Sequence, residues 1–457
     1  MSFSLELTPS QHDLVERTHR FAEEVVRPVA AQYDREEEFP WPVLERAGEE
    51  GFYHALFYRD LIADPTGLSL PLFMEELFWG CAGIGLAIVM PALAMSAMSQ
   101  AASPDQLVHW APECFGEPGN LKLAALAVSE PEGGSDVASL RTRARRDGDE
   151  WVIDGRKIWI GNGGIANVHV VTASVDPELG SKGQALFVVE KDTPGLKFVR
   201  KLEKLGCRAS HTAELSFENC RIPEENLLGG WEKLERKLDE GRSGKGRAAT
   251  LGAFEQTRPM VAAQALGIAR AALEFACAYA AEREAFDEPI IQKQGIAFPL
   301  ADIAAELDAA RLLTWRAAWM AAEGIPFHLA EGSMSKLFAS EVAVRATEKA
   351  VQVCGGWGYV KDLPVEKWYR DAKLYTIFEG TSEIQRLVIG RTLSEAGPQG
   401  PLHHRLPERD GPVTSSFGRG AKPRSKLGLA LLRMARRTPD PLLRGAGKVA
   451  SPPKRGK

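Results

Sequence analysis

Apolar side chains near the start of the chain recur at the spacing of an amphipathic helix. After a Thr-Pro-Ser start signal at residues 8–10, the apolar positions of this segment are Leu14, Val15, Phe21, Val25 and Val26. Similar patterns continue to about Gln100. The first part of the chain is therefore predicted to be helical.

The pattern changes twice further along the chain. Between about Leu123 and Ile222, short apolar runs such as KIWIG and QALFVVE are separated by Gly, Pro and Asp, which is typical of antiparallel strands. From about Ala248 to Leu393, Ala-rich segments with few breakers favour long helices. The predicted fold class is α+β, mainly α: an N-terminal helical domain, a central antiparallel β domain and a C-terminal helical domain. We expect its parts at residues 1–121, 122–229, 230–250 (a charged linker), 251–397 and 398–457 (a basic tail).

One apolar run meets the length criterion for a membrane span. Leu77–Met98 has 22 residues without a charge. Glu75 and Glu76 precede it with no Lys or Arg nearby, Pro91 interrupts it, and its many small residues suit close packing between helices. We therefore predict a buried helix pair and no transmembrane segment.

The segment expected to act as a linker is WEKLERKLDEGRSGKGRAAT, Trp231–Thr250. Its GRSGKG part does not satisfy the phosphate-loop pattern G-x-x-x-x-G-K-[ST], so a flexible connection is predicted. No G-x-G-x-x-G follows a strand, which leaves a Rossmann dinucleotide site without support.

Charge separates the tail from the rest of the chain. The net charge is -5, but from Pro401 onward 14 Lys and Arg stand against 3 Asp and Glu, so the tail carries +11 and the remainder -16. This acidic balance argues against nucleic-acid binding. We expect a disordered Pro/Gly-rich tail, in which Ser425–Arg437 has the pattern of a short basic amphipathic helix suited to weak contact with an anionic membrane surface.

The six cysteines are scattered, with no spacing typical of metal ligands, so we expect a reducing compartment and no bound metal. The N-terminus turns charged and polar before a signal-peptide core could form. A cytoplasmic location is expected.

The stretch LYTIFEGTSEIQR, Leu374–Arg386, places the carboxylate of Glu379 between an apolar run and a Gly-Thr-Ser turn. A charge in such surroundings is costly to bury. Ser382 followed by Gln385 predicts a capping box that starts a helix. Glu379 is therefore expected just before a helix N-terminus, next to something buried.

Five other motifs each allow two interpretations. SEPEGGSD (129–136) is either a plain turn or a loop that brings backbone N–H groups to a ligand. Trp159 in RKIWIGNGG (156–164) is either a core anchor or a wall for a flat ring. The helix start in GAFEQTRP (252–259) is either a surface cap or an anion site. AYAAEREAFDEPIIQKQ (278–294) and QVCGGWGY (352–359) are either ordinary helix faces and ends or contact surfaces for another molecule.

Taken in order, these motifs resemble those of the acyl-CoA dehydrogenases over residues 7–393. The most specific part is IFEGTSEIQR together with QVCGGWGY, which starts 25 residues earlier. GAFEQTRPMVAAQALGIA and WIGNGGIAN are most similar to the medium/short-chain-like branch. The resemblance implies a C-terminal four-helix bundle and an FAD-containing homotetramer, with a mixed assembly as the alternative.

The resemblance also implies a reaction. Glu379 would remove a proton from the carbon next to the thioester carbonyl of an acyl-CoA, the β-carbon would pass a hydride to flavin N5, and trans-2-enoyl-CoA would result. Because an aliphatic C–H is a very weak acid, the base needs short reach and a water-poor site. Electron-transfer flavoprotein is the implied electron acceptor, and fatty-acid β-oxidation the implied pathway.

Binding residues follow from the resemblance by motif. Those expected to line the flavin are Leu126, Val128, Ser129, Gly134, Ser135, Trp159, Ile160 and Gly161. Those expected at the FAD end nearest the base are Thr381, Ser382 and Glu383. Those expected at the FAD of a neighbouring subunit are Arg283, Lys293, Gln294, Gln352, Gly355 and Gly356. Those expected at acyl-CoA are Ser135, Glu255, Thr257, Arg258 and Gly380.

Four positions depart from the usual pattern of the family. Gly161 stands where many relatives carry a Ser or Thr whose hydroxyl bonds the flavin, Ala285 replaces a frequent Thr, Glu255 a frequent Asp, and Glu132 a frequent Gly. Two other functions therefore stay open: an acyl-CoA oxidase that passes electrons to oxygen, and a non-catalytic subunit of a mixed assembly. The sequence does not predict the length of the acyl chain.

Overall fold

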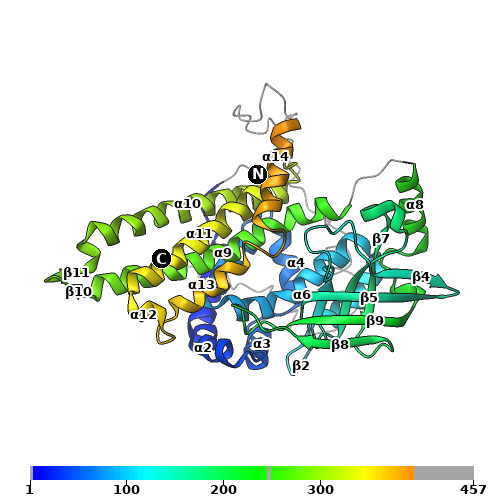
Figure 1. The fold of residues 1–457 in the computed structure, drawn as a ribbon, viewed down its shortest axis with the longest axis horizontal. Helices are drawn as coiled ribbons and strands as arrows, with labels where there is room; N and C mark the ends of the chain where they lie inside the picture. Colours follow the sequence, from blue (N-terminus) through cyan, green and yellow to red (C-terminus); the bar gives the residue numbers. More distant parts are fainter. Residues whose placement is uncertain (1–3, 244–248, 396–457) are drawn as a thin grey trace, which may run out of the picture.

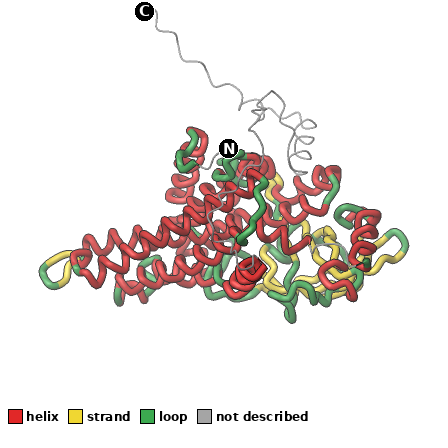
Figure 2. The backbone as a smooth tube through the Cα atoms, turned by 90° about the horizontal axis from the view of Figure 1, so that it is seen from above, coloured by secondary structure: helices red, strands yellow, loops and turns green. Residues whose placement is uncertain are grey.

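The computed structural model describes residues 4–243 and 249–395 of the chain (Figure 1). The basic tail predicted at 398–457 lies outside these residues. Within them, helices occupy the N-terminal and C-terminal parts and a sheet occupies the middle, which confirms the predicted fold class. Figures 1 and 2 show the large sheet at one end of the molecule and the small β10–β11 hairpin at the other.

The N-terminal part begins with a capped helix. The Thr8 side chain accepts a hydrogen bond from the Gln11 N–H, and the Gln11 side chain accepts one from the Thr8 N–H, which satisfies two N–H groups at the start of α1. One π-helical turn, Ala22–Val26, joins α1 to α2. The helices of this part are α1 (Pro9–Phe21), α2 (Arg27–Glu36), α3 (Trp41–Glu49), α4 (Ala55–Ala63), α5 (Ser69–Gly80), α6 (Ala82–Ala101) and α7 (Pro104–Phe115).

The long apolar run forms the predicted buried helix pair, α5 and α6. The break between the two helices lies at Cys81, whose backbone is extended (φ -165°, ψ 125°). Pro91 lies inside α6, so the expectation that it interrupts the run is wrong. By length and composition alone, two described helical segments, Ala82–Ala101 and Thr257–Glu282, could cross a membrane, but 67% of each apolar window is buried within the protein.

The central sheet has the strand order β3-β6-β4-β5-β9-β8, with β7 paired to β6. Most neighbours are antiparallel, as predicted, although β3 and β4 each pair with β6 in parallel. The strands are β3 (Ala124–Ala127), β4 (Arg143–Asp147), β5 (Glu150–Gly161), β6 (Val168–Ser174), β7 (Gln184–Glu190), β8 (Leu196–Lys201) and β9 (Thr212–Pro223), and a separate hairpin pairs β1 (Gly116–Glu117) with β2 (Asn120–Leu121).

The charged segment after the sheet contains a helix, α8 (Trp231–Arg242). Leu234 and Leu238, four residues apart, are buried on one face of this helix. The flexible connection predicted for this segment is therefore wrong over residues 231–242. Residues 244–248 lie outside the described part of the chain.

The C-terminal part is a helical bundle that packs closely on α5. A Cβ at Gly267 in α9 would lie 2.3 Å from the Glu75 carbonyl oxygen, so the two helices approach at a position where only Gly fits. Arg270 and Arg311 add ion pairs to the α5 carboxylates. The elements are α9 (Ala249–Glu282), β10 (Glu284–Ala285), β11 (Glu288–Pro289), α10 (Gln294–Glu323), α11 (Glu331–Cys354), α12 (Gly356–Tyr359), α13 (Val365–Leu374) and α14 (Ser382–Glu395).

Candidate active site

Glu379 lies in the loop between α13 and α14, as predicted, in an uncommon backbone conformation. Its φ is +53° and that of Gly380 is +88°, so two consecutive residues are in the left-handed region. For a residue with a Cβ this costs roughly 1–3 kcal/mol and persists only where the surroundings impose it. The Gly380 carbonyl oxygen accepts hydrogen bonds from Lys336 Nζ (2.7 Å) and Gln385 Nε2 (2.9 Å). These two side chains hold the loop in place.

The predicted capping box at Ser382 is wrong. The Thr381 hydroxyl accepts the hydrogen bond of the Ile384 N–H (3.2 Å) and so caps α14 one residue earlier. Gln385 does not reach back to a cap N–H, because its side chain binds the loop carbonyls of Glu379 and Gly380. Within the described residues, the buried Ser382 hydroxyl has no partner.

The carboxyl group of Glu379 is desolvated next to two cations. Its Oε2 atom is buried and has no hydrogen-bond partner among the described residues. Burial raises the pKa of Glu379, while the charges of Lys336 and Arg258 act in the opposite direction. Burial in turn lowers the pKa of Lys336 to about 8 and that of Arg258 to about 10. A carboxylate so placed is a stronger base than one in water and is still able to ionise.

Glu379 lines a cavity of about 290 Å³ whose other lining residues are mostly apolar. Its walls come from α4, α5, α6, α9 and α10. Representative lining residues are Leu61, Met74, Val89, Met90, Met260, Val261 and Ala318. This space suits an aliphatic chain that ends near the carboxylate.

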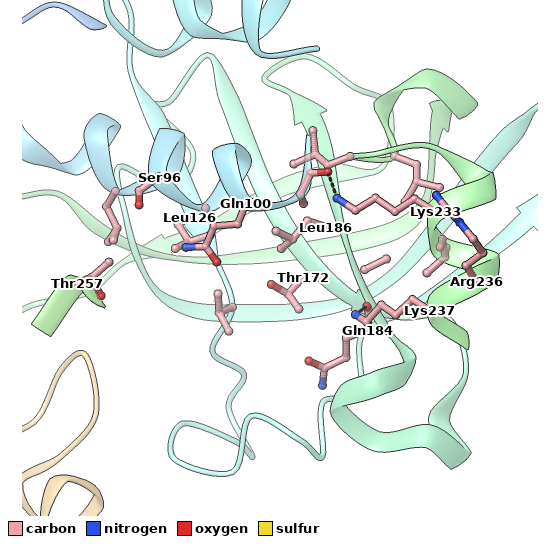
Figure 3. Close-up of a pocket in the computed structure, with 18 of the residues that line it drawn as sticks. Ser96, Gln100, Leu126, Thr172, Gln184, Leu186, Lys233, Arg236, Lys237 and Thr257 are labelled. Carbon is pink, nitrogen blue, oxygen red and sulfur yellow. Dashed lines mark hydrogen bonds between the residues drawn. The ribbon is translucent and has the colours of Figure 1, made fainter. Parts of the chain in front are cut away.

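A second cavity, of about 400 Å³, adjoins the first (Figure 3). The two share the lining residues Leu93, Ser96, Gln100 and Thr257. Leu126 and Val128 also line the second cavity, which brings two predicted flavin residues next to the predicted acyl-CoA residue Thr257. The two cavities are therefore neighbours, the first beside Glu379 and the second beside α8.

The flavin motifs of the sheet come together at the end of β5. The Ser129 carbonyl oxygen accepts the hydrogen bond of the Ile158 N–H (3.0 Å). Trp159 is 56% exposed with φ +60°, so its ring is not a core anchor. A Cβ at Gly134 would lie 3.6 Å from that ring, and Ser135 is exposed beside Gly134. An exposed indole face beside a glycine turn fits the flat ring of a flavin, so these residues suit FAD; Ile160, by contrast, is buried in the core.

The departure at Gly161 has a local cause. A Cβ at this position would lie 2.8 Å from the sulfur of Met90 in α6, closer than real side chains come. The methionine side chain therefore occupies the space of the Ser or Thr side chain common in the family.

The residues predicted to meet the FAD of a neighbouring subunit lie at the far end of the helical bundle, away from Glu379 (Figure 1). Lys293 is partly exposed and pairs with Glu288. The fully surface-exposed members of the set are Arg283, Gln294, Gln352, Gly355 and Gly356. Glu383 is exposed four residues after Glu379, whereas Glu255 belongs to a stretch whose side chains the structure does not describe.

Two buried lysines of the site were not predicted. Lys336, described above, holds the loop of Glu379 although it lies 44 residues away along the chain. Lys157, with 0% exposure, donates to the Val128 carbonyl oxygen and to the Glu130 carboxylate, both at 2.8 Å, and so fixes the SEPEGGSD turn. Neither lysine has a sequence signal, because each contact is long-range. Within the described residues, no group of three or more His, Cys, Asp or Glu could hold a metal ion.

The sequence was compared with models of known protein families and with known proteins. Family models described as the N-terminal, middle and C-terminal domains of acyl-CoA dehydrogenase match residues 8–118, 125–220 and 244–394. The chain is 43% identical over 394 residues to the short-chain specific acyl-CoA dehydrogenase, mitochondrial, of Bos taurus, covering 84% of this chain and 90% of that protein.

Solved structures of similar fold point to the same family. Butyryl-CoA dehydrogenase from Megasphaera elsdenii superposes with a TM-score of 0.76 at 33% identity, over 86% of this chain and 100% of that one. A chain in a structure of the electron transferring flavoprotein of Acidaminococcus fermentans superposes with a TM-score of 0.76 at 34% identity, over 85% and 99%. The chain therefore belongs to the acyl-CoA dehydrogenase family of oxidoreductases.

Proposed function

We propose that the protein is an FAD-dependent acyl-CoA dehydrogenase in which Glu379 is the base that removes the proton next to the thioester carbonyl. The observation that carries this proposal is the buried, unpartnered Oε2 of Glu379 on the wall of an apolar cavity. Desolvation raises the basicity of a carboxylate, and a weak carbon acid requires such a base.

The backbone of the same loop is suited to stabilise the enolate. Within the described residues, the N–H of Glu379 donates no hydrogen bond, so it is available to a substrate oxygen. A donor fixed in advance at the place where negative charge develops lowers the barrier. Gly380, Lys336 and Gln385 keep this N–H in place.

Bound FAD would accept the hydride released by the β-carbon. The residues that would hold it within one chain are those around the exposed Trp159 and the Gly134 turn, with Thr381 and Ser382 near the base. The exposed far-end set beginning at Arg283 would meet the FAD of a second subunit, and a homotetramer is the proposed assembly. Fatty-acid β-oxidation is the proposed pathway, and electron-transfer flavoprotein the proposed acceptor.

The test is anaerobic bleaching of flavin absorbance by a panel of acyl-CoAs of increasing chain length. We expect Glu379→Gln to keep FAD and acyl-CoA binding but to slow flavin reduction by about 10²- to 10⁴-fold, the usual contribution of a general base. Burial raises the pKa of Glu379 above the ordinary carboxylate value of 4.5. The rate of flavin reduction by the wild-type protein should therefore begin to fall at a higher pH than an ordinary carboxylate would give, because the protonated acid cannot act as a base. Glu348→Gln, a surface carboxylate paired with Lys349, is the matched control.

Near-normal reduction in Glu379→Gln would mean that another group is the base. Rapid reoxidation of the reduced flavin by air, with peroxide formation, would replace the dehydrogenase by an oxidase. Protein that takes up no FAD would support a non-catalytic subunit.

A further inference from the structure

Three basic side chains of α8 line the second cavity, at the end opposite Thr257 (Figure 3). They are Lys233, Arg236 and Lys237, which share one side of the helix through their i, i+3 and i, i+4 spacing. Leu234 and Leu238, which are also four residues apart, lie on another face of the helix and are buried in the core. The helix therefore uses one face to anchor itself and another to present positive charge to the cavity.

We propose that this side of α8 binds the phosphate groups at the nucleotide end of the acyl-CoA substrate. The proposal rests on the proposed function, because it takes the acyl group to lie beside Glu379. Helix α8 falls between residues 220 and 244, outside the stretches that the middle and C-terminal family models match.

Two of the three charges, those of Arg236 and Lys237, are not matched by a carboxylate of the described residues. Lys237 is half-buried, and its Nζ donates to the Gln184 carbonyl oxygen at 2.5 Å. Among the described residues, neither Lys237 nor Arg236 has a carboxylate at ion-pair distance. Burial and the charge of Lys233 lower the pKa of Lys237. A half-buried ammonium without a counterion is unfavourable, and a bound anion removes that cost.

Buried cations elsewhere in the chain are paired with carboxylates. Lys157 pairs with Glu130, and Arg270 pairs with Glu76. In the second cavity the acidic lining residue is Glu240, an exposed side chain at the far end of α8, against three cations. At Arg236 and Lys237 the described residues thus supply positive charge, and a bound anion would supply the negative charge.

A buried acceptor lies between the cations and Thr257. Gln184 is 3% exposed, and its side chain donates to the Val137 carbonyl oxygen, but its Oε1 has no partner within the described residues. Gln100 and Thr172 add polar groups along the same wall, among leucines such as Leu186 and Leu228. An unsatisfied carbonyl in such a wall suits an amide N–H of a ligand.

The order of these groups matches one molecule read from end to end. An acyl chain would fill the apolar cavity, its thioester would lie at Glu379, the amides of the pantetheine arm would pass Gln100 and Gln184, and the phosphates would reach α8. The shared lining residues Ser96 and Thr257 place the two cavities side by side along this order.

The test compares two thioesters of the same acyl group, acyl-CoA and acyl-pantetheine, which lacks the nucleotide and its phosphates. In the triple variant Lys233→Gln, Arg236→Gln, Lys237→Gln, we expect the KM for acyl-CoA to rise roughly tenfold or more, with kcat and the KM for acyl-pantetheine unchanged. Arg242→Gln, on the same helix but paired with Asp176 and outside the cavity lining, is the control for loss of charge alone.

A measurement on the wild-type protein makes the test independent of how the variants fold. Raising the salt concentration should raise the KM for acyl-CoA but not that for acyl-pantetheine. Equal salt dependence for the two thioesters, or an equal change of both KM values in the triple variant, would overturn the role of α8. If neither thioester reduced the flavin, the proposed function itself would be overturned.

Discussion

At the scale of single residues, Glu379 shows how a carboxyl group is kept in an unfavourable state. Its backbone has a positive φ, and its carboxyl group is buried near two cations. The surrounding contacts impose both features: Lys336 and Gln385 bind the next carbonyl, and Thr381 caps the following helix. The stability of the neighbouring helices therefore maintains the strained loop.

Gly161 and Met90 give a prediction at this scale. Because a Cβ at Gly161 would lie 2.8 Å from the sulfur of the flexible Met90 side chain, which can move toward the adjoining cavity, Gly161→Ser should lower the free energy of unfolding by no more than about 1 kcal/mol. In a Met90→Ala background the same serine should cost much less, since the space is then open. Thermal unfolding of the two single variants and the double variant measures the coupling. Strictly additive losses would show that the two residues do not compete for one space.

Residue chemistry predicted part of the site and missed the rest for identifiable reasons. Glu379 before a helix start was predictable, because a lone carboxylate in an apolar run needs a cause. Whether Thr381 or Ser382 caps α14 depends on the backbone angles of the preceding loop, which the sequence does not reveal. Lys336 and Lys157 contact residues that are far away along the chain, so the sequence around each lysine does not predict its role.

At the scale of elements, β6 is buried along its whole length between neighbouring strands. It carries His169, whose Nε2 accepts the Gly164 N–H at 3.2 Å and whose pKa is lowered by burial to about 4. The strand therefore places a neutral imidazole inside the sheet.

His169 predicts a pH dependence of stability. Between pH 6.5 and pH 4 the unfolded chain binds a proton at this residue that the folded chain does not, so stability falls as the pH drops through this window. The slope should be roughly 1.4 kcal/mol per pH unit steeper than in His169→Gln, which keeps an acceptor for Gly164. Urea unfolding at several pH values measures it. A similar change of slope in His12→Gln, on the exposed surface of α1, would contradict the assignment to His169.

The alternation of helix, sheet and helix was predictable from hydrophobic periodicity, because each element type repeats its apolar positions at its own spacing. Helix α8 was not predictable, because its charged composition favours a flexible connection. Its two buried leucines, four residues apart, anchor it all the same. Composition describes a segment alone, whereas folding depends on whether a neighbouring surface accepts its apolar face.

At the scale of the whole molecule, the far end of the helical bundle exposes large aromatic side chains. Phe286 in the β10–β11 hairpin is 88% exposed, and Tyr359 in α12 is 86% exposed. They lie next in sequence to predicted contacts for the FAD of a second subunit, and exposed apolar groups of this size favour burial in an interface. The proposed assembly would cover them.

We predict that Phe286→Ser combined with Tyr359→Ser lowers the oligomeric order and the FAD content together, because each FAD would lose the contacts of the neighbouring subunit. Light scattering after gel filtration measures the first quantity, and the ratio of flavin to protein absorbance measures the second. Leu205→Ser, which removes an exposed side chain in the β8–β9 loop, is the control. Unchanged mass with full FAD content would show that this end is not the interface.

Helix α6 is a wall common to the two cavities. Met90 and Met95 face the cavity beside Glu379, where the acyl group is proposed to lie (the acyl side). Ala97 and Ala101 face the cavity beside α8, where the nucleotide is proposed to lie, and Ser96 and Gln100 face both cavities. A substitution that widens one cavity by shifting this helix would narrow the other. Selection for a new acyl group through α6 would thus come with a change in affinity for the carrier. Residues of α4 and α10, such as Ile62 and Ala322, line only the acyl side, and they are the positions where chain-length preference can change independently, in evolution or by design.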